Sequence, residues 1–227
     1  MNLQERAEQV RFRIAEACRR SGRDRDSVEI IAVTKYVSLD TARAVVDLGF
    51  DKIGENRWQD VKPKWEALGS RVEWHFIGHL QTNKVKDVVG KFRYIHSLDR
   101  LSLAKEINKR GEAMDTVVDC LIQVNISGEE SKYGLSPEQF FPFIEQVRSF
   151  PFIRVAGLMT MAPYESEPED TRPVFHGLRQ LRDECNQRAL LKEEIRHLSM
   201  GMSNDFEVAI EEGATWVRLG SILVGKE

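Results

Sequence analysis

Short apolar runs alternate with longer amphipathic stretches along the whole chain, and this alternation limits the possible folds more than any other feature. The apolar runs predict strands over residues 28–34, 52–54, 73–77, 94–96, 117–124, 153–157, 196–198 and 216–219. Helical spacing of apolar residues predicts crossover helices over 39–48, 57–68, 82–89, 100–110, 137–149, 171–188 and 204–212. Strands that alternate with helices in this way are typical of parallel sheets in α/β proteins.

Eight strand–helix units in 227 residues favour a single closed (β/α)8 barrel over an open doubly wound sheet. The first residues add an amphipathic helix in front of the barrel, because apolar side chains recur there at helical spacing. These are Leu3, Ala7, Val10, Ile14 and Ala17. No linker interrupts the pattern, and the stretch 163–173, rich in proline and acids, is interpreted as a long loop before a helix. We expect one domain over residues 1–227.

Composition is that of an ordinary soluble globular protein, with 41% hydrophobic residues, 30% charged residues and a net charge of −3. Without a basic excess, a nucleic acid is not the expected partner. Cys18, Cys120 and Cys185 are odd in number and widely spaced, which excludes a disulfide framework and fits a reducing cytoplasm. No apolar run reaches the roughly 18 residues of a membrane span, and the charged amino terminus is unlike a signal peptide.

Lys35 is a lone cation at the downstream end of the first predicted strand. In a (β/α)8 barrel, the carboxyl ends of the strands form the rim on which active sites are built. A partly desolvated lysine on that rim loses some preference for its charged form and can condense with a carbonyl to give a Schiff base. The common alternative is a strand-end lysine that only extends its amine into solvent.

Two turns of small residues follow the last two predicted strands. Gly201 allows a tight turn, and Ser203 or Asn204 can cap the next helix, whose first amides would point toward an anion. Gly220 and Ser221 offer unhindered amides and a hydroxyl after the eighth strand. Barrels often bind phosphate with the loops after strands seven and eight, so the two turns together predict a phosphate site.

An ordinary capped helix is the alternative for the first of these turns, since Asn204 and Glu207 have capping-box spacing. Arg218 lies two residues before Gly220 and is predicted to point toward the barrel interior or its mouth. An arginine buried there needs a hydrogen-bond acceptor.

A family pattern runs nearly from end to end of the chain. Its motifs are AVTK at 32–35, GENR at 54–57, HFIGHLQTNK at 75–84, GLM at 157–159, SMGMS at 199–203 and RLGS at 218–221. With these motifs the chain resembles the pyridoxal phosphate homeostasis proteins. That family shares the TIM barrel of the N-terminal domain of alanine racemase and of bacterial ornithine decarboxylase.

The resemblance implies that Lys35 holds pyridoxal 5'-phosphate as an internal aldimine, and that Ser203, Gly220 and Ser221 grip the phosphate. It also implies that Arg218 faces the pyridine nitrogen. A permanently charged donor at this position keeps the nitrogen unprotonated and weakens the ring as an electron sink.

Two further residues are expected at the cofactor. Asn56 ends the second predicted strand and would face the cofactor from the rim, with turn chemistry as its alternative role. Met159 follows the sixth predicted strand and could pack on the ring, although a methionine there is more often core. His75 and His79 do not form a metal pair, because their strand-and-loop setting does not place them on one face. Lys132 is interpreted as a flexible surface lysine, although the resemblance places a lysine there too.

Racemases and decarboxylases with this barrel add a separate β domain and use a second acid/base, commonly a tyrosine. The sequence ends at Glu227 with no expected room for that domain. Its tyrosines, Tyr36, Tyr94, Tyr133 and Tyr164, offer no obvious substitute. Tyr36 is predicted to point away from its neighbour Lys35, as adjacent residues of an extended segment do.

The resemblance therefore implies a monomeric cytoplasmic protein that carries or buffers pyridoxal 5'-phosphate, with no catalytic residues and no metal. Apoenzymes that use this cofactor are the expected recipients. A racemase or decarboxylase of low activity is one alternative. A cofactor-free Schiff-base aldolase acting on a phosphorylated sugar is another, since it would use the same lysine.

Overall fold

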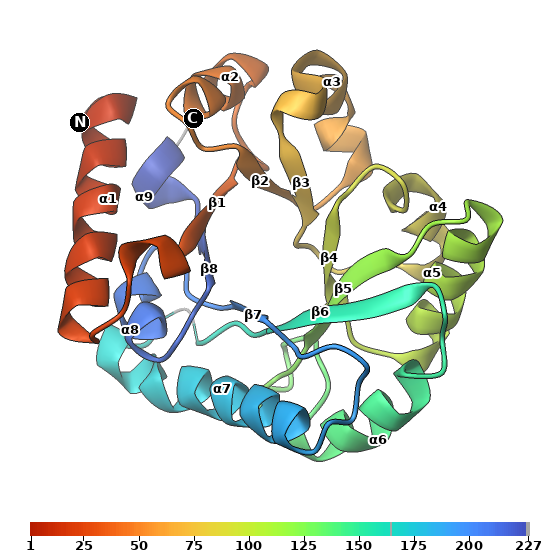
Figure 1. Cartoon of the computed structure of the whole chain (residues 1–227). Helices are drawn as coiled ribbons and strands as arrows, with labels where there is room; N and C mark the ends of the chain where they lie inside the picture. The colour runs from red at the N-terminus through yellow and green to blue at the C-terminus, as the bar shows by residue number, and fades with distance from the viewer. Residues whose placement is uncertain (164, 226–227) are drawn as a thin grey trace.

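A computed structural model describes residues 1–163 and 165–225 and shows a closed barrel of eight parallel strands (Figure 1). The strands are β1 (Glu29–Val33), β2 (Lys52–Glu55), β3 (Glu73–Phe76), β4 (Tyr94–Leu98), β5 (Val118–Gln123), β6 (Ile153–Met159), β7 (His197–Ser199) and β8 (Trp216–Leu219). The barrel closes between β1 and β8, where Glu29 pairs with Trp216 and Ala32 pairs with Leu219. The predicted (β/α)8 barrel is therefore confirmed.

The helices surround the barrel and connect its strands (Figure 1). They are α1 (Leu3–Arg20), α2 (Leu39–Asp47), α3 (Trp58–Leu68), α4 (Val85–Val88), α5 (Leu101–Ala113), α6 (Pro137–Val147), α7 (Arg172–Gln187), α8 (Phe206–Glu211) and α9 (Ser221–Val224). Short 3-10 helices cover Arg25–Ser27, Gly69–Arg71, Thr82–Lys84 and Pro168–Thr171. The sequence pattern did not predict α9 or the 3-10 helices Arg25–Ser27, Gly69–Arg71 and Pro168–Thr171, because each is too short to show a helical period. The helix predicted over 82–89 covers Thr82–Lys84 and α4.

Most predicted boundaries differ from the observed ones by one to three residues, and three of these differences bear on the site. β2 ends at Glu55, so Asn56 follows the strand, and β6 runs two residues beyond the predicted end to include Met159. α8 begins at Phe206 and lacks the predicted capping box: Asn204 Nδ2 donates to the carbonyl of Ser166 at 3.2 Å instead. The contact with Ser166 ties the β7–α8 turn to the loop after β6.

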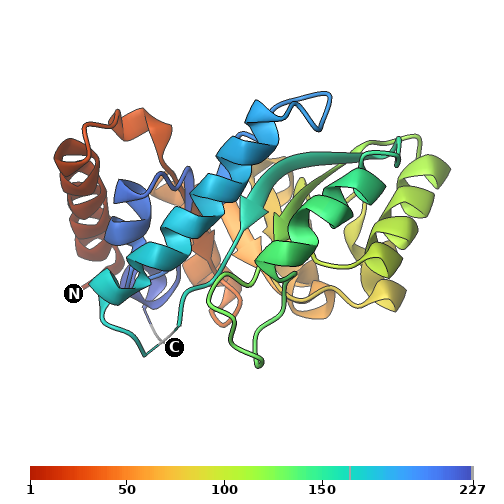
Figure 2. The ribbon, with the colours of Figure 1, turned by 90° about the horizontal axis from the view of Figure 1, so that it is seen from below.

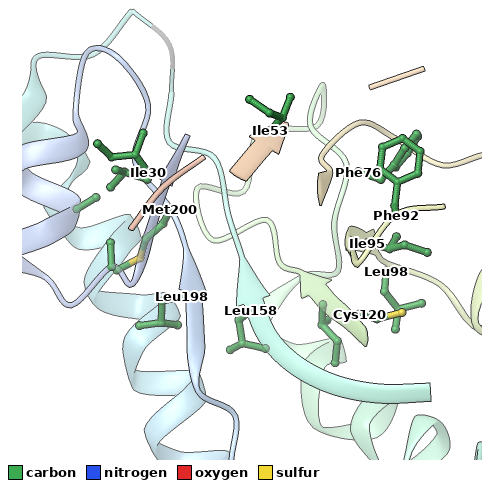
Figure 3. Close-up of a cluster of buried hydrophobic side chains, with 14 of the residues drawn as sticks. Ile30, Ile53, Phe76, Phe92, Ile95, Leu98, Cys120, Leu158, Leu198 and Met200 are labelled. Atoms are coloured by element: carbon green, nitrogen blue, oxygen red, sulfur yellow. The ribbon is translucent and has the colours of Figure 1, made fainter. Parts of the chain in front are cut away.

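Two separate apolar clusters build the core. The larger lies between the barrel and its helices and includes the buried residues that Figure 3 labels on the strands, such as Ile30, Ile53 and Leu158. The smaller lies apart from it and consists of Ile31, Leu121, Met159 and Trp216, with Tyr94 and Met161 against it. Side chains alternate between the two faces of a barrel strand, so the smaller cluster fills part of the barrel interior.

Ion pairs occupy the end of the barrel at which the strands begin. Lys52 Nζ lies 3.0 Å from Glu29 Oε1, and the Trp216 indole donates to Glu29 Oε2 at 2.8 Å. Asp119 accepts from Arg154 Nη2 at 2.8 Å and also from Arg93. These contacts fill the end of the barrel at which the strands begin. A binding site is therefore expected at the opposite end, the carboxyl rim.

The amino-terminal helix α1 packs against α8 and α9, and both ribbon views show the three side by side (Figures 1 and 2). Its predicted apolar stripe is confirmed, because Ala7, Val10, Ile14 and Ala17 are buried. Arg6 of α1 donates to the carbonyl of Leu223 at 2.9 Å. The first helix therefore supports the last one. None of the helices in the described residues is long and apolar enough to cross a membrane.

Candidate functional site

Lys35 lies on the carboxyl rim, two residues after β1, in a turn closed by a hydrogen bond from Val37 N to Thr34 O of 3.1 Å. Its Nζ lies 4.9 Å from the centre of the Tyr36 ring. The prediction that Tyr36 points away from Lys35 is thus wrong, because the backbone turns here instead of staying extended. Apart from that ring contact, Lys35 has no hydrogen bond or ion pair with any described residue, so its amine is uncommitted.

A buried ion pair supports the backbone that carries Lys35. Lys64 of α3 donates to the carbonyl of Thr34 at 2.5 Å and to Glu55 Oε1 at 3.0 Å. The Thr34 hydroxyl donates to the same carboxylate oxygen at 2.6 Å. Lys64 is 6% exposed and Glu55 is 0% exposed, so the pair is shielded from solvent. It ties together the ends of β1 and β2 at the residue before Lys35.

This support was not predicted from the sequence, although the helix carries a signal for it. Val61, Lys64 and Leu68 recur at helical spacing and are the buried residues of α3. A lysine inside such an apolar stripe requires a buried partner, because an unpaired charge there is costly.

Gly201 and Asp205 shape the turn after β7. Gly201 has φ +92°, and a Cβ at this position would lie 2.6 Å from Ala209 Cβ, so only glycine fits. The Asp205 carboxylate accepts from the amide of Met202 at 2.6 Å and closes the turn. Burial raises the pKa of Asp205, while this backbone hydrogen bond and the positive charge of Arg218 oppose the rise.

This turn meets the turn after β8, as Ile222 N lies 3.5 Å from Ser203 Oγ. The main-chain amides of Ser203, Asn204, Gly220 and Ser221 have no hydrogen-bond acceptor among the described residues. Free amides gathered in two touching turns form a place where an anion can bind. The structure therefore brings Ser203, Gly220 and Ser221 together, as predicted.

The same turn lies beside the strand that carries the lysine. A Cβ on Gly220 would lie 3.7 Å from Val33 Cβ, and Val33 is two residues before Lys35. The amine and the free amides thus belong to neighbouring segments of one rim, because β1 and β8 are adjacent in the closed barrel.

Arg218 is a buried cation without an ion pair among the described residues. It is 4% exposed; Nη1 donates to Ser199 Oγ at 2.7 Å and Nη2 to the carbonyl of Thr160 at 3.0 Å. Burial lowers the pKa of Arg218 to about 10, against an opposing effect of the Asp205 charge, so the guanidinium stays charged at neutral pH. A buried cation held only by neutral acceptors favours an anionic ligand.

Asn56 and Met159 differ in accessibility. Asn56 is half-buried on the rim, where the β3 loop packs so closely that a Cβ on Gly78 would lie 2.8 Å from the Asn56 carbonyl. Met159 is 1% exposed and belongs to the interior cluster with Ile31, Leu121 and Trp216. Met159 therefore packs as a core residue. A contact of Asn56 or Met159 with a ligand stays a prediction.

Two loops meet over the rim through aromatic stacking. The ring of Tyr133, in the loop after β5, stacks on His79, in the loop after β3, with centroids 3.8 Å apart. Next to Tyr133, the side chain of Lys132 is only 17% exposed; it pairs with Glu129 and donates to the Met161 carbonyl at 3.4 Å. The interpretation of Lys132 as a flexible surface lysine is therefore wrong.

The remaining tyrosines lie in different settings. Tyr94 is inside the barrel, with its ring centre 5.0 Å from His75 and 4.8 Å from Trp216. Tyr36 is 77% exposed. Tyr164 lies outside the described residues.

A surface cleft of about 670 Å³ lies between the start of α3 and the loop after β3. Asn56, Trp58, His79 and Lys84 are among the residues that line it. It borders the rim at Asn56 but includes neither Lys35 nor Arg218. The Lys35 amine and the Arg218 guanidinium therefore lie outside this cleft.

Residues 7–227 match the family described as the N-terminal domain of alanine racemase. The pyridoxal phosphate homeostasis protein of Aquifex aeolicus is 48% identical over 227 residues, which cover 100% of this chain and 99% of that protein. The pyridoxal phosphate homeostasis protein of Pseudomonas aeruginosa is 36% identical, over 98% of this chain and 95% of that protein.

Solved structures show the same likeness. PipY of Synechococcus elongatus, with pyridoxal 5'-phosphate bound, has a TM-score of 0.85 and 29% identity, covering 99% of this chain and 100% of that chain. An unknown protein from Bifidobacterium adolescentis has a TM-score of 0.92 and 34% identity, covering 97% of this chain and 94% of that chain. Alanine racemase of Clostridium difficile shares the fold, with a TM-score of 0.78 at 16% identity over 98% of this chain and 56% of that chain.

Proposed function

Because this chain belongs to the pyridoxal phosphate homeostasis protein family, we propose that it binds pyridoxal 5'-phosphate at the carboxyl rim and holds it in reserve. One observation carries the proposal: an uncommitted lysine amine, an arginine without an ion pair and two touching turns with free amides lie on one rim. A single ligand with an aldehyde, a phosphate and a ring nitrogen that accepts a hydrogen bond matches all three features.

The residues fit the phosphate group. A phosphate needs several hydrogen-bond donors in a positive setting, and main-chain amides in tight turns supply them without a side-chain entropy cost. Ser203, Gly220 and Ser221 offer these amides, and the two serines add hydroxyls. The charge of Arg218 makes the setting positive.

When bound, the cofactor supplies an aldehyde and an electron-accepting ring. Lys35 would hold the cofactor through its amine, by condensation with the aldehyde and loss of water. Arg218 directs a charged donor at the ring nitrogen, which keeps that nitrogen unprotonated and leaves the ring a weak electron sink. Asn56 would contribute a polar contact from the rim, and Met159 would contribute to the apolar interior on which the ring packs.

A weak electron sink favours storage over carbanion chemistry, so the protein buffers the cofactor and passes it to apoenzymes. We place it in the cytoplasm, since Cys18, Cys120 and Cys185 are free and buried, as suits a reducing compartment. We also propose that it is a monomer. Incubation of the loaded protein with amino acids in deuterated water tests the storage role. No deuterium is expected at an amino-acid α-carbon, and steady incorporation would show a working racemase.

Titration of the purified protein with pyridoxal 5'-phosphate, followed by visible absorbance, tests the binding itself. The wild type is expected to turn yellow with saturation at one cofactor per chain. Lys35→Ala is expected to lose the band, whereas Lys86→Ala, which removes an exposed lysine of α4, is expected to keep it. A wild type that stays colourless, or a Lys35→Ala variant with the full band, would refute the proposal.

A further inference from the structure

A chain of hydrogen bonds crosses the barrel interior from Arg218 on β8 to Glu73 on β3. Arg218 Nη1 donates to Ser199 Oγ at 2.7 Å, and that oxygen lies 2.9 Å from His96 Nδ1. His96 Nε2 lies 2.9 Å from His75 Nδ1, and His75 Nε2 lies 3.1 Å from Glu73 Oε1. Ser199, His96 and His75 are each 0% exposed, so water does not complete these bonds.

The two ends of the chain fix the direction of every hydrogen bond in it. A guanidinium can only donate, and an ionised carboxylate can only accept. Glu73 accepts from His75 Nε2, so Nδ1 of a neutral His75 ring is an acceptor and His96 donates to it from Nε2. Nδ1 of a neutral His96 ring then accepts from the Ser199 hydroxyl, whose oxygen accepts from Arg218. Both histidines are neutral Nε2–H tautomers in this arrangement.

The groups around the two rings favour this neutral state. Burial is the main cause that lowers the pKa of His75, with Glu73 and Glu29 opposing it and Lys52 assisting. Burial also lowers the pKa of His96, and the positive charges of His75, Arg218 and His197 would lower it further. A second proton on either ring would occupy a nitrogen that already accepts a hydrogen bond.

We propose that His96 and His75 are positioning residues for Arg218. They hold the Ser199 hydroxyl with its hydrogen turned away from the guanidinium and its lone pairs turned toward it. The carbonyl of Thr160 accepts from the other terminal nitrogen at 3.0 Å, so both ends of the guanidinium fork are held. The other N–H groups of Arg218 have no acceptor among the described residues and remain for the ligand.

The effect on the cofactor rests on the proposed function, because it requires that Arg218 faces the ring nitrogen. The order of the protons along the chain does not rest on the proposed function, since it follows from contacts within the protein alone. Aligned hydrogen bonds with a charge at each end strengthen one another. Breaking one link in the middle therefore weakens the hold on Arg218 at the end.

Nitrogen-15 NMR of the cofactor-free protein, labelled at histidine and held at neutral pH, tests the proton order. We expect His75 and His96 to show a hydrogen on Nε2 and none on Nδ1, with the signals assigned by His75→Gln and His96→Gln. A hydrogen on Nδ1 of either ring would overturn the proposed order. This measurement needs no cofactor, so its result is independent of whether pyridoxal 5'-phosphate binds.

The loaded protein tests the positioning role. His96→Leu removes both ring nitrogens, whereas His96→Gln keeps one acceptor and one donor, as the relay requires. We expect His96→Leu to shift the visible band and to speed cofactor release by about tenfold, because the Ser199 hydroxyl loses its partner and no longer holds Arg218 in one orientation. His96→Gln should keep the wild-type band and release rate.

Ser199→Ala is the second variant, since it removes only one oxygen and disturbs packing little. Ser199→Ala should show the same band position and release rate as expected for His96→Leu. It keeps the positioning role testable if His96→Leu folds poorly. Wild-type behaviour of Ser199→Ala, or equal effects of His96→Gln and His96→Leu, would contradict the positioning role. A colourless wild type would refute the cofactor proposal while the proton order is still decided by NMR.

Discussion

The position of Lys35 depends on residues that would not contact the cofactor. The carbonyl of the preceding residue, Thr34, is fixed by Lys64, and Lys64 is in turn paired with Glu55. The second oxygen of that carboxylate, Glu55 Oε2, has no hydrogen-bond partner in the part of the chain that the structure describes. Glu55 is therefore balanced mainly by Lys64, which makes this lysine a sensitive point in the fold.

Lys64→Met keeps the length of the side chain but leaves a buried carboxylate without its cation. We expect the free energy of unfolding in urea to fall by about 3–5 kcal/mol, the usual result of removing one partner of a buried pair. Lys62→Met, which changes an exposed lysine of the same helix, should alter it by less than about 0.5 kcal/mol. Equal losses in the two variants would show that the buried pair contributes nothing.

Gly201 is needed for its space as well as for its backbone angle. Gly201 and Gly22 both have positive φ, but a Cβ on Gly22 meets nothing within 4 Å, whereas one on Gly201 lies 2.6 Å from Ala209 Cβ. Gly22→Ala should cost about 1–2 kcal/mol from the left-handed backbone alone. Gly201→Ala should cost more and should also weaken pyridoxal 5'-phosphate binding, because it displaces the turn that holds Ser203. Equal cofactor affinity of both variants in the absorbance titration would contradict this role of the turn.

At the scale of elements, α1 acts on the site through α9. Arg6 of α1 donates to the last carbonyls of α9, at 2.9 Å to Leu223 and 3.1 Å to Val224, and α9 begins at the turn with the free amides. The helix that precedes the barrel in sequence thus holds the segment that follows its last strand. Figure 2 shows the two helices side by side.

Arg6→Met should therefore loosen α9 and weaken cofactor binding by roughly threefold to tenfold, since hydrogen bonds from a charged donor are lost. Its effect on the free energy of unfolding should be about 1–2 kcal/mol. Arg19→Met is the matched control on α1, because Arg19 is exposed and, within residues 1–163 and 165–225, pairs only with Glu16 of the same helix. If both variants bind the cofactor as the wild type does, α1 does not support the site.

The sequence predicted each strand of the barrel because apolar runs and helical periods are local properties. Strand ends were less predictable: β6 extends to Met159 because it pairs with both β5 and β7, and this pairing is not visible in the run itself. The turn that brings Tyr36 to Lys35 was missed for the same reason, since the Thr34–Val37 hydrogen bond forms only when the strand has ended.

Among the site residues, the sequence predicted those that belong to motifs and missed those that act through contacts across the barrel. His75, His96 and Ser199 come from three strands and meet only when the barrel closes. A hint was present, because a polar residue in a buried strand needs a buried partner. The identity of that partner depends on registers that the sequence alone does not reveal.

The barrel interior holds several histidines in the neutral state, and this makes the free energy of unfolding depend on pH in the acid range. Burial lowers the pKa of His75 and His96, and it lowers that of His197 to about 4. In the unfolded chain the same groups titrate near 6.5. Below that pH the unfolded state binds more protons than the folded state, so stability is full above 6.5 and falls as the pH drops toward 4.

We expect the free energy of unfolding to decrease from pH 7 to pH 5, as measured by urea unfolding at each pH. His197→Gln should have a shallower decrease, because it removes one of the groups whose pKa burial lowers. A flat profile for the wild type over this range would show that the interior histidines are not held neutral.

The most direct test of the central claim, that Lys35 is the covalent anchor of a stored cofactor, is reductive trapping. The protein is loaded with pyridoxal 5'-phosphate, reduced with borohydride, digested and mapped by mass spectrometry. We predict a phosphopyridoxyl group on Lys35 in the wild type and none there in Lys35→Ala. A modification confined to other lysines such as Lys132, or no modification at all, would contradict the claim.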